Sequence, residues 1–411
     1  MITTELFNVL LLVAAALIFA RVLGYLFYKL KQPAVIGEII AGILLGGLAL
    51  YFFSGQQLVI SSYAISLPTF DFKSAGYVLL AEIGILFLLF ISGMETSLSK
   101  LKKTEKTSSF VAIGGVLVPL VLGFTACVFL DLTIQESIVV GLILTATSVG
   151  VTVRVLMDLH ALNTDAGATI LGGAVIDDVI GIILLAFVLG IEKSLFDVAW
   201  VGVKIVIFFL IFLLLGLKLI DKILGLGEKI HMPKAFLSIS LAILLIYSFF
   251  ADKAGISGII GAFIAGLLIG QNMRSSKIVD DVKALGYGFF IPIFFVGVGA
   301  SIWVETSMDL SSYATIAIFA VVIIIVSIVG KIAGCGIGAK LAGMSNRESL
   351  QVGVGMIPRM ELALIIAAAA ISRGLLTGDV AHQILITTIL LTIVTTLLAP
   401  FLIKATFKNN E

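Results

Sequence analysis

The chain has 411 residues, of which 60% are hydrophobic and only 12% are charged, and its mean hydropathy is +1.22. A soluble protein of this length would expose far more lysine and glutamate, so the composition predicts a polytopic membrane protein. The formal net charge of +1 argues against a nucleic-acid-binding surface.

About thirteen apolar segments follow one another along the chain, each close to the roughly 20 residues that a helix needs to cross a membrane. The pattern predicts an all-α polytopic membrane protein in which residues 1–411 form a single transmembrane domain without a soluble domain. The predicted spans are residues 5–28, 34–51, 76–94, 108–130, 137–157, 166–190, 198–220, 234–251, 255–271, 285–304, 312–339, 349–372 and 382–403.

The basic residues predict the orientation of these spans. If the N-terminus lies outside, 18 of the 26 lysines and arginines fall in loops and helix ends on the cytoplasmic side, 4 fall on the opposite side and 4 fall within spans. Cytoplasmic loops of membrane proteins carry an excess of Lys and Arg. The sequence therefore predicts an outside N-terminus and a cytoplasmic C-terminus.

An internal repeat relates the second span to the ninth. Residues 35–46 and 259–270 share the spacing of their glycines, which are Gly37, Gly42 and Gly46 in the first copy and Gly261, Gly266 and Gly270 in the second. The copies are seven crossings apart, so they enter the membrane from opposite sides, as in the inverted repeats of secondary transporters. The alternative is that glycine-rich membrane helices share such spacing without a common origin.

Two adjacent acids, Asp177 and Asp178, lie within the apolar stretch 171–190. Placing a carboxylate near the middle of a bilayer costs roughly 2.5–3.5 kcal/mol on insertion scales. Carboxylate oxygens bind both protons and small hard cations. The pair therefore predicts an ion-exchange site.

The span 137–157 contains the polar cluster Thr145, Thr147 and Ser148 near its middle. Hydroxyls and freed carbonyls at this depth are suitable ligands for a dehydrated cation. The alternative is that the hydroxyls bond back to carbonyls of the preceding helical turn.

The span 349–372 is the inverted counterpart of 137–157 and carries Pro358 near its middle. Proline removes a helical hydrogen bond, so we expect a break that exposes backbone groups and the dipoles of two half-helices. Arg359 and Glu361 adjoin this break, where their charges are suited to neutralise the ends of two crossing broken helices.

Lys331 is a basic residue inside the span 312–339. Its depth and that of Asp177 differ by only a few ångström at about 1.5 Å per helical residue, so an ion pair is feasible. We assign Asp177 to the lysine and Asp178 to the transported ion, although the sequence leaves the opposite assignment open. The alternative for Lys331 is snorkelling to the membrane surface.

Two further intramembrane acids, Glu38 and Glu82, lie outside this set. They are more readily explained as structural partners of Arg21 than as ion ligands, because buried acids need a partner.

Five motifs, read in order along nearly the whole chain, resemble the bacterial and archaeal cation:proton antiporter family, with related Kef-type potassium/proton exchangers. They are residues 32–46, 80–95, 145–156, the pair Asp177–Asp178 and residues 353–366. The pattern is most similar to NapA-type sodium/proton antiporters with thirteen spans. The resemblance implies a homodimer whose core, about 108–190 and 312–403, moves in an elevator-like cycle against a dimerisation part, about 5–94 and 198–304.

The resemblance also implies roles for individual residues. Asp178 matches the ion-binding aspartate, and Asp177 matches the aspartate that pairs with the lysine at position 331. The other matches are Thr147 and Ser148 in the first unwound segment, which we expect to bind the ion together with Asp178, and Glu361 near the second. From their positions in the sequence, we expect Thr145, Pro358, Arg359 and Glu361 to support the crossing helices.

The resulting prediction is a transporter of a prokaryotic cytoplasmic membrane that exchanges Na⁺, or Li⁺, for H⁺ and uses no cofactor. In this family a double aspartate implies electrogenic exchange, here two protons per sodium. A K⁺/H⁺ antiporter and a sodium-coupled organic-anion symporter are the alternatives. An intramembrane aspartyl protease is disfavoured, because neighbouring residues on one helix diverge by about 100° and cannot form its dyad.

Overall fold

The computed structural model describes residues 4–30, 32–53, 57–60, 63–66, 68–188, 195–229, 232, 234–255, 257–272, 278–301 and 313–407. The predicted span ends at residues 189–190, 302–304 and 312 fall outside these ranges. The chain divides into two compact units, residues 1–88 with 281–308 and residues 89–280 with 309–411. The predicted core and dimerisation parts divide the chain differently and stay a prediction.

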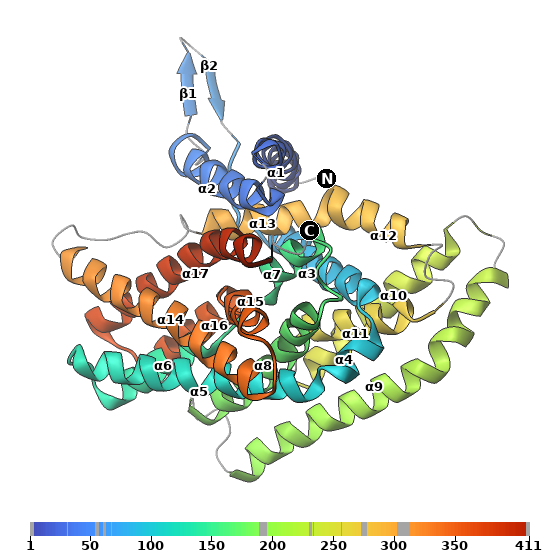
Figure 1. Ribbon diagram of the computed structural model, residues 1–411. Helices are drawn as coiled ribbons and strands as arrows, with labels where there is room; N and C mark the ends of the chain where they lie inside the picture. Colours follow the sequence, from blue (N-terminus) through green and yellow to red (C-terminus); the bar gives the residue numbers. More distant parts are fainter. Residues whose placement is uncertain are drawn as a thin grey trace. The chain divides into compact units, whose positions relative to one another are not determined.

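The first unit combines helices from both repeats with a short hairpin. Its helices are α1 (Thr4–Lys29), α2 (Ala34–Phe52), most of α3 (Ala75–Glu95), the end of α12 (Val279–Leu285), the π-helical turn η2 (Gly286–Phe290) and α13 (Ile291–Ala300). The strands β1 (Gln57–Ile60) and β2 (Tyr63–Ser66) pair antiparallel and form the hairpin of Figure 1. This hairpin is an addition to the predicted all-α fold, because strands of four residues are too short to appear in a search for spans.

Glycines allow α2 and α13 to pack backbone against backbone. A Cβ atom on Gly42 would lie 2.0 Å from the carbonyl oxygen of Val296, and one on Gly299 would lie 1.9 Å from that of Ile39. Any larger residue at either position would force the helices apart. The close approach is the expected use of small residues in membrane helices, where lipid supplies no hydrophobic force between them.

The π-helical turn η2 leads directly into Pro292 at the start of α13. A π-helical bond would run from the Tyr287 carbonyl to the residue five positions on, which is Pro292 and has no N–H. Arg21 of α1 donates a hydrogen bond to this carbonyl instead. Arg21 therefore has a structural role in the first unit.

The second unit holds the remaining helices. These are α4 (Leu98–Lys103), α5 (Glu105–Phe129), α6 (Ile134–Thr145), α7 (Val149–Asp158), α8 (Asp165–Val188), α9 (Leu195–Lys229), α10 (Ala235–Lys253), α11 (Gly258–Gly270), α14 (Tyr313–Leu341), α15 (Asn346–Gly355), α16 (Glu361–Ser372) and α17 (Gly378–Phe407). Helix α14 packs along α5 and also contacts α15 and α17, while α5 contacts α6 and α8 (Figure 1).

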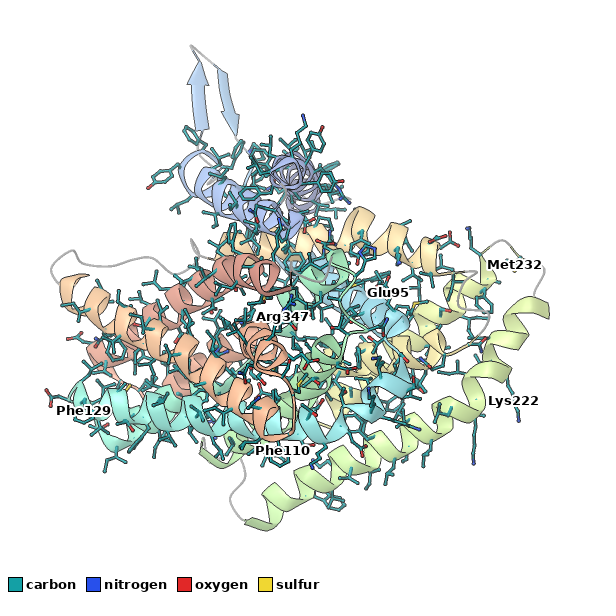
Figure 2. The ribbon with its side chains drawn as sticks, in the orientation of Figure 1. Glu95, Phe110, Phe129, Lys222, Met232 and Arg347 are labelled. Atoms are coloured by element: carbon teal, nitrogen blue, oxygen red, sulfur yellow. The ribbon has the colours of Figure 1, made fainter. Side chains whose placement is uncertain are left out.

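A buried apolar cluster joins α5, α6, α14, α16 and α17. Its fully buried members include Leu144, Ala367 and Leu391. On the outside, apolar side chains are exposed: Phe129 of α5 is 82% exposed and projects from the helix in Figure 2. This pattern suits a protein whose solvent is lipid.

Every predicted span overlaps a helix or a broken pair of helices. Among the described residues, nine helical segments are long and apolar enough to cross a membrane, and two shorter apolar helices lie at Gly258–Gly270 and Leu362–Ile371. The total of thirteen crossings stays a prediction. One boundary was clearly wrong: α9 continues to Lys229 rather than ending at 220, because charged residues end an apolar run without ending a helix.

Candidate ion-binding site

Two helices of the second unit are interrupted, and their unwound segments touch. Residues 146–148 separate α6 from α7, and residues 356–360 separate α15 from α16. The Ser148 N–H donates to the Pro358 carbonyl at 2.8 Å, and the Thr152 hydroxyl donates to the Gly355 carbonyl at 2.7 Å. These bonds confirm the predicted pair of crossing discontinuous helices.

The two breaks have different causes. In residues 356–360, Pro358 lacks the N–H needed to continue α15, as the sequence predicts. The first break contains neither glycine nor proline, and Ala146 has the extended angles φ −56° and ψ 134°. Tertiary contacts, such as the bond from Ser148 to Pro358, therefore maintain the first break.

A single fully buried arginine binds the carboxyl ends of both half-helices. Arg359 Nη1 donates to the carbonyls of Met356 at 3.2 Å and Ile357 at 3.0 Å, at the end of α15. Its Nη2 donates to the Leu144 carbonyl at 2.9 Å, in the last turn of α6. The positive charge thus meets the negative ends of two helix dipoles.

Asp177 and Lys331 form a completely buried ion pair. Lys331 Nζ lies 3.1 Å from Asp177 Oδ2 and 3.3 Å from Oδ1, and both side chains are at most 2% exposed. The pairing predicted from their depths is therefore present, and Lys331 does not snorkel. The Thr147 hydroxyl donates to the same Oδ2 at 2.5 Å, so the first break is tied to the ion pair.

Asp178 has a different environment from its neighbour. It lines a small cavity of about 20 Å³, which is close to the space that one water molecule needs. The other lining residues are apolar and come from α3, α7, α8 and α11: Leu89, Val149, Leu171, Ala174, Val175, Ile259, Ile260 and Phe263.

The hydroxyls at the first break have distinct partners. Thr145 bonds back to the Leu142 carbonyl at 2.7 Å, which is the structural alternative considered for this cluster. Thr147 binds Asp177. Ser148 Oγ is buried and has no hydrogen-bond partner among the described residues.

Comparisons with known proteins identify the family of this chain. The transmembrane sodium/hydrogen exchanger family matches residues 13–408. The chain belongs to this family. The Na⁺/H⁺ antiporter of Enterococcus hirae is 34% identical to this exchanger over 381 residues, which cover 92% of the chain and 93% of that protein.

Two further proteins resemble the exchanger. The Na⁺/H⁺-K⁺ antiporter GerN of Bacillus cereus is 31% identical over 400 residues, covering 97% of this chain and 96% of that protein. The solved structure of the sodium proton antiporter MjNhaP1 from Methanocaldococcus jannaschii matches with a TM-score of 0.67 at 21% identity, covering 98% of this chain and 97% of that chain. This likeness shows a shared fold. The resemblance stated from the motifs is therefore confirmed, and the protein is a transporter rather than an enzyme.

Some residues of the candidate site could not be recognised in the sequence. Thr395 Oγ1 accepts a hydrogen bond from the Arg359 N–H at 3.1 Å, and the Thr396 hydroxyl donates to the Arg359 carbonyl at 3.2 Å. The several threonines of the apolar helix α17, which the structure buries, were a signal of polar contacts inside the protein. The sequence did not indicate which residue they contact. For Glu361, the structure describes only the backbone, at the start of α16.

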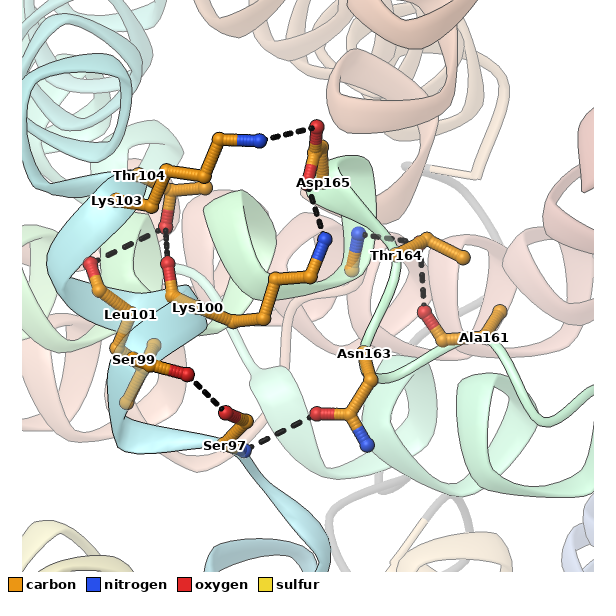
Figure 3. A network of polar contacts seen from close by, with 11 residues as sticks. Ser97, Ser99, Lys100, Leu101, Lys103, Thr104, Ala161, Asn163, Thr164 and Asp165 are labelled. Carbon is orange, nitrogen blue, oxygen red and sulfur yellow. Dashed lines mark hydrogen bonds and ion pairs between the residues drawn. The ribbon is translucent and has the colours of Figure 1, made fainter.

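A polar junction joins the short helix α4 to the loop before α8 (Figure 3). Asn163 accepts a bond from the Ser97 N–H at 3.0 Å, and Lys100 Nζ lies 2.7 Å from Asp165 Oδ1. Asp165 precedes the predicted span 166–190, and the Lys100 hydrogen bond holds the pKa of its carboxyl below the ordinary 3.8. The carboxylate therefore stays ionised at neutral pH, as its pairing with Lys100 requires.

Proposed function

We propose that the protein exchanges Na⁺ for H⁺ across the membrane, with Asp178 and Ser148 as ligands of the transported ion. The observation that carries the proposal is the buried Asp177–Lys331 pair next to a second carboxylate on a cavity of single-ion size. One aspartate is thus neutralised by a fixed cation, while its neighbour has room for a mobile one.

The proposed cycle depends on competition between the two ions. A proton or a sodium ion on Asp178 neutralises enough charge for the core to move, whereas an uncompensated charge in the membrane is costly. Sodium binding weakens the adjacent Asp177–Lys331 pair and releases the proton of the lysine. The cycle then returns two protons for one sodium ion and moves one net charge.

Thr147 and Arg359 support this cycle without binding the ion. Thr147 links the unwound segment to Asp177, so a change in the ion pair reaches the crossing. Arg359 holds both half-helix ends. We further propose that the core, residues 108–190 and 312–403, moves as an elevator in a homodimer, against residues 5–94 and 198–304.

Potassium is the competing substrate. The relative GerN is named a Na⁺/H⁺-K⁺ antiporter, so K⁺/H⁺ exchange is the second candidate function.

The test uses proteoliposomes that contain an internal pH dye, to which Na⁺, Li⁺ or K⁺ is added between pH 6 and 9. We expect Na⁺ to evoke proton movement in the wild type and Asp178→Asn to abolish it. Asp379→Asn is the matched control, because Asp379 is exposed at the start of α17, and this variant should behave as the wild type.

Two results would contradict the sodium proposal. A response to K⁺ alone would identify a potassium exchanger. No response to any cation would favour the sodium-coupled organic-anion symporter.

A further inference from the structure

Helices α5 and α14 are in direct backbone contact next to the buried ion pair. A Cβ atom on Gly114 would lie 2.2 Å from the Gly334 carbonyl oxygen, and one on Gly334 would lie 2.2 Å from the Gly114 carbonyl oxygen. Lys331 lies one turn before Gly334 on α14. The lysine therefore emerges from a helix surface that is already in contact with its neighbour.

The residue of α5 that faces Lys331 is Gly115. A Cβ atom built on Gly115 would lie 3.3 Å from Lys331 Nζ and 2.5 Å from Cys335 Sγ. Both side chains are completely buried. The lysine and the cysteine, one turn apart on α14, thus occupy the space that a side chain at position 115 would need.

The backbone carbonyl of Gly115 is a further polar group close to Lys331. Pro119, four residues on, has no N–H and cannot give the Gly115 carbonyl its usual helical hydrogen bond. A small apolar side chain here would replace bare backbone with a methyl group beside the ammonium. Among the described residues, the other charged or titratable groups that act on Lys331 are Asp177 of α8, Cys335 of its own helix and Arg359 of the second break.

We propose that Gly115 is a positioning residue for Lys331: its missing side chain lets the ammonium group remain against Asp177. The readout in transport rests on the proposed Na⁺/H⁺ exchange. A methyl group at position 115 crowds the ammonium and disfavours its charged form, so the lysine proton should be released at lower pH.

The experiment compares Cys335→Ala with the double variant Gly115→Ala, Cys335→Ala. Removing the sulfur eliminates the 2.5 Å conflict and leaves only the contact with Lys331. In proteoliposomes we expect the pH of half-maximal Na⁺-evoked proton movement to fall by at least about half a unit in the double variant relative to Cys335→Ala.

The control is Gly123→Ala on the same helix. Its Cβ would lie 2.9 Å from the end of the Leu144 side chain and makes no contact with Lys331. It should lower thermal stability without moving the pH profile. If Gly115 had only a structural role, the double variant would likewise lose thermal stability without a shift of its pH profile.

The outcomes separate the two proposals. If the wild type and Cys335→Ala exchange Na⁺ for H⁺ and the double variant has an unchanged pH profile, the role of Gly115 is refuted. If neither shows cation-evoked proton movement, the exchange proposal fails, and Gly115 is then judged from crosslinking. A carbodiimide should join Lys331 to Asp177 less in the double variant than in Cys335→Ala, and equal yields would overturn the inference.

Discussion

Asp177 and Asp178 are adjacent in the chain and yet lie in different surroundings. Asp177 is buried against Lys331 and the Thr147 hydroxyl, whereas Asp178 lines the small cavity. Successive residues on a helix point about 100° apart, so one turn of α8 can serve a fixed cation and a mobile one. In the proposed cycle, the first carboxylate pairs with the lysine and the second exchanges its occupant.

The hydroxyl of Thr147 is expected to act on ion binding through its hydrogen bond to Asp177. Thr147→Val removes the hydrogen bond to the Asp177 carboxylate while keeping the side-chain volume. A hydrogen bond to a charged group contributes about 1.5–3 kcal/mol, so we expect at least a roughly tenfold loss in apparent Na⁺ affinity. The measurement is the Na⁺ concentration that gives half-maximal proton movement. Thr147→Ser keeps the hydroxyl and should retain most activity; equal losses in both variants would contradict this role.

At the scale of the elements, the two broken helices depend on one another. The Ser148 N–H reaches the Pro358 carbonyl, and Arg359 binds the carboxyl ends of α6 and α15. Each first half begins with a capping box, Thr133 with Glu136 for α6 and Ser345 with Glu348 for α15. The capping boxes stabilise the N-termini of the two half-helices, and Arg359 satisfies carbonyls at their C-termini. Both helices can therefore end inside a membrane, where unsatisfied carbonyls are costly.

Arg359→Gln should therefore destabilise the crossing. The substitution leaves buried carbonyls without a charged donor, and each unsatisfied group costs about 1–3 kcal/mol. We expect a loss of about 3 kcal/mol or more, seen as a lower thermal unfolding temperature of the purified protein. Arg359→Lys keeps the charge, but an ammonium group cannot reach all three carbonyls as the planar guanidinium does. Its unfolding temperature should therefore lie between those of the wild type and the glutamine variant. Wild-type stability in the glutamine variant would show that the guanidinium is dispensable.

At the scale of the whole molecule, the inverted repeat appears in the way the glycine helices pack. In the first unit α2 packs on α13 through Gly42, and in the second unit the end of α3 packs on α11 through Gly93 and Gly266. Each repeat thus supplies a helix that packs on the other repeat. This reciprocal packing is expected of an inverted-repeat transporter.

The proposed stoichiometry has a consequence at the scale of the whole molecule, which is a voltage-dependent cycle. With two protons per sodium, one net charge moves per cycle, which is worth about 2.3 kcal/mol per 100 mV. We expect an imposed potential of about 100 mV to change the steady-state Na⁺ gradient of loaded proteoliposomes by roughly fiftyfold. A gradient that does not respond to voltage would indicate electroneutral exchange of one proton per sodium. Lys331→Gln removes the proposed second proton carrier, so it is the variant to compare with the wild type.

The sequence by itself determined the features that depend on local composition. Apolar length located the spans, Pro358 predicted the second break, and the glycine spacing revealed the repeat. The depths of Asp177 and Lys331 were sufficient to propose their pairing, because a buried lysine needs an acid at its own level.

Only the tertiary structure decided which groups meet across helices. The break at residues 146–148 has no helix-breaking residue. Of the hydroxyls at this break, that of Thr145 bonds to a backbone carbonyl, that of Thr147 bonds to Asp177, and that of Ser148 has no partner among the described residues. The threonines that hold Arg359 lie on α17, and Gly115 faces Lys331 from α5. Such contacts depend on the distance and rotation between packed helices, which no local pattern of residues specifies.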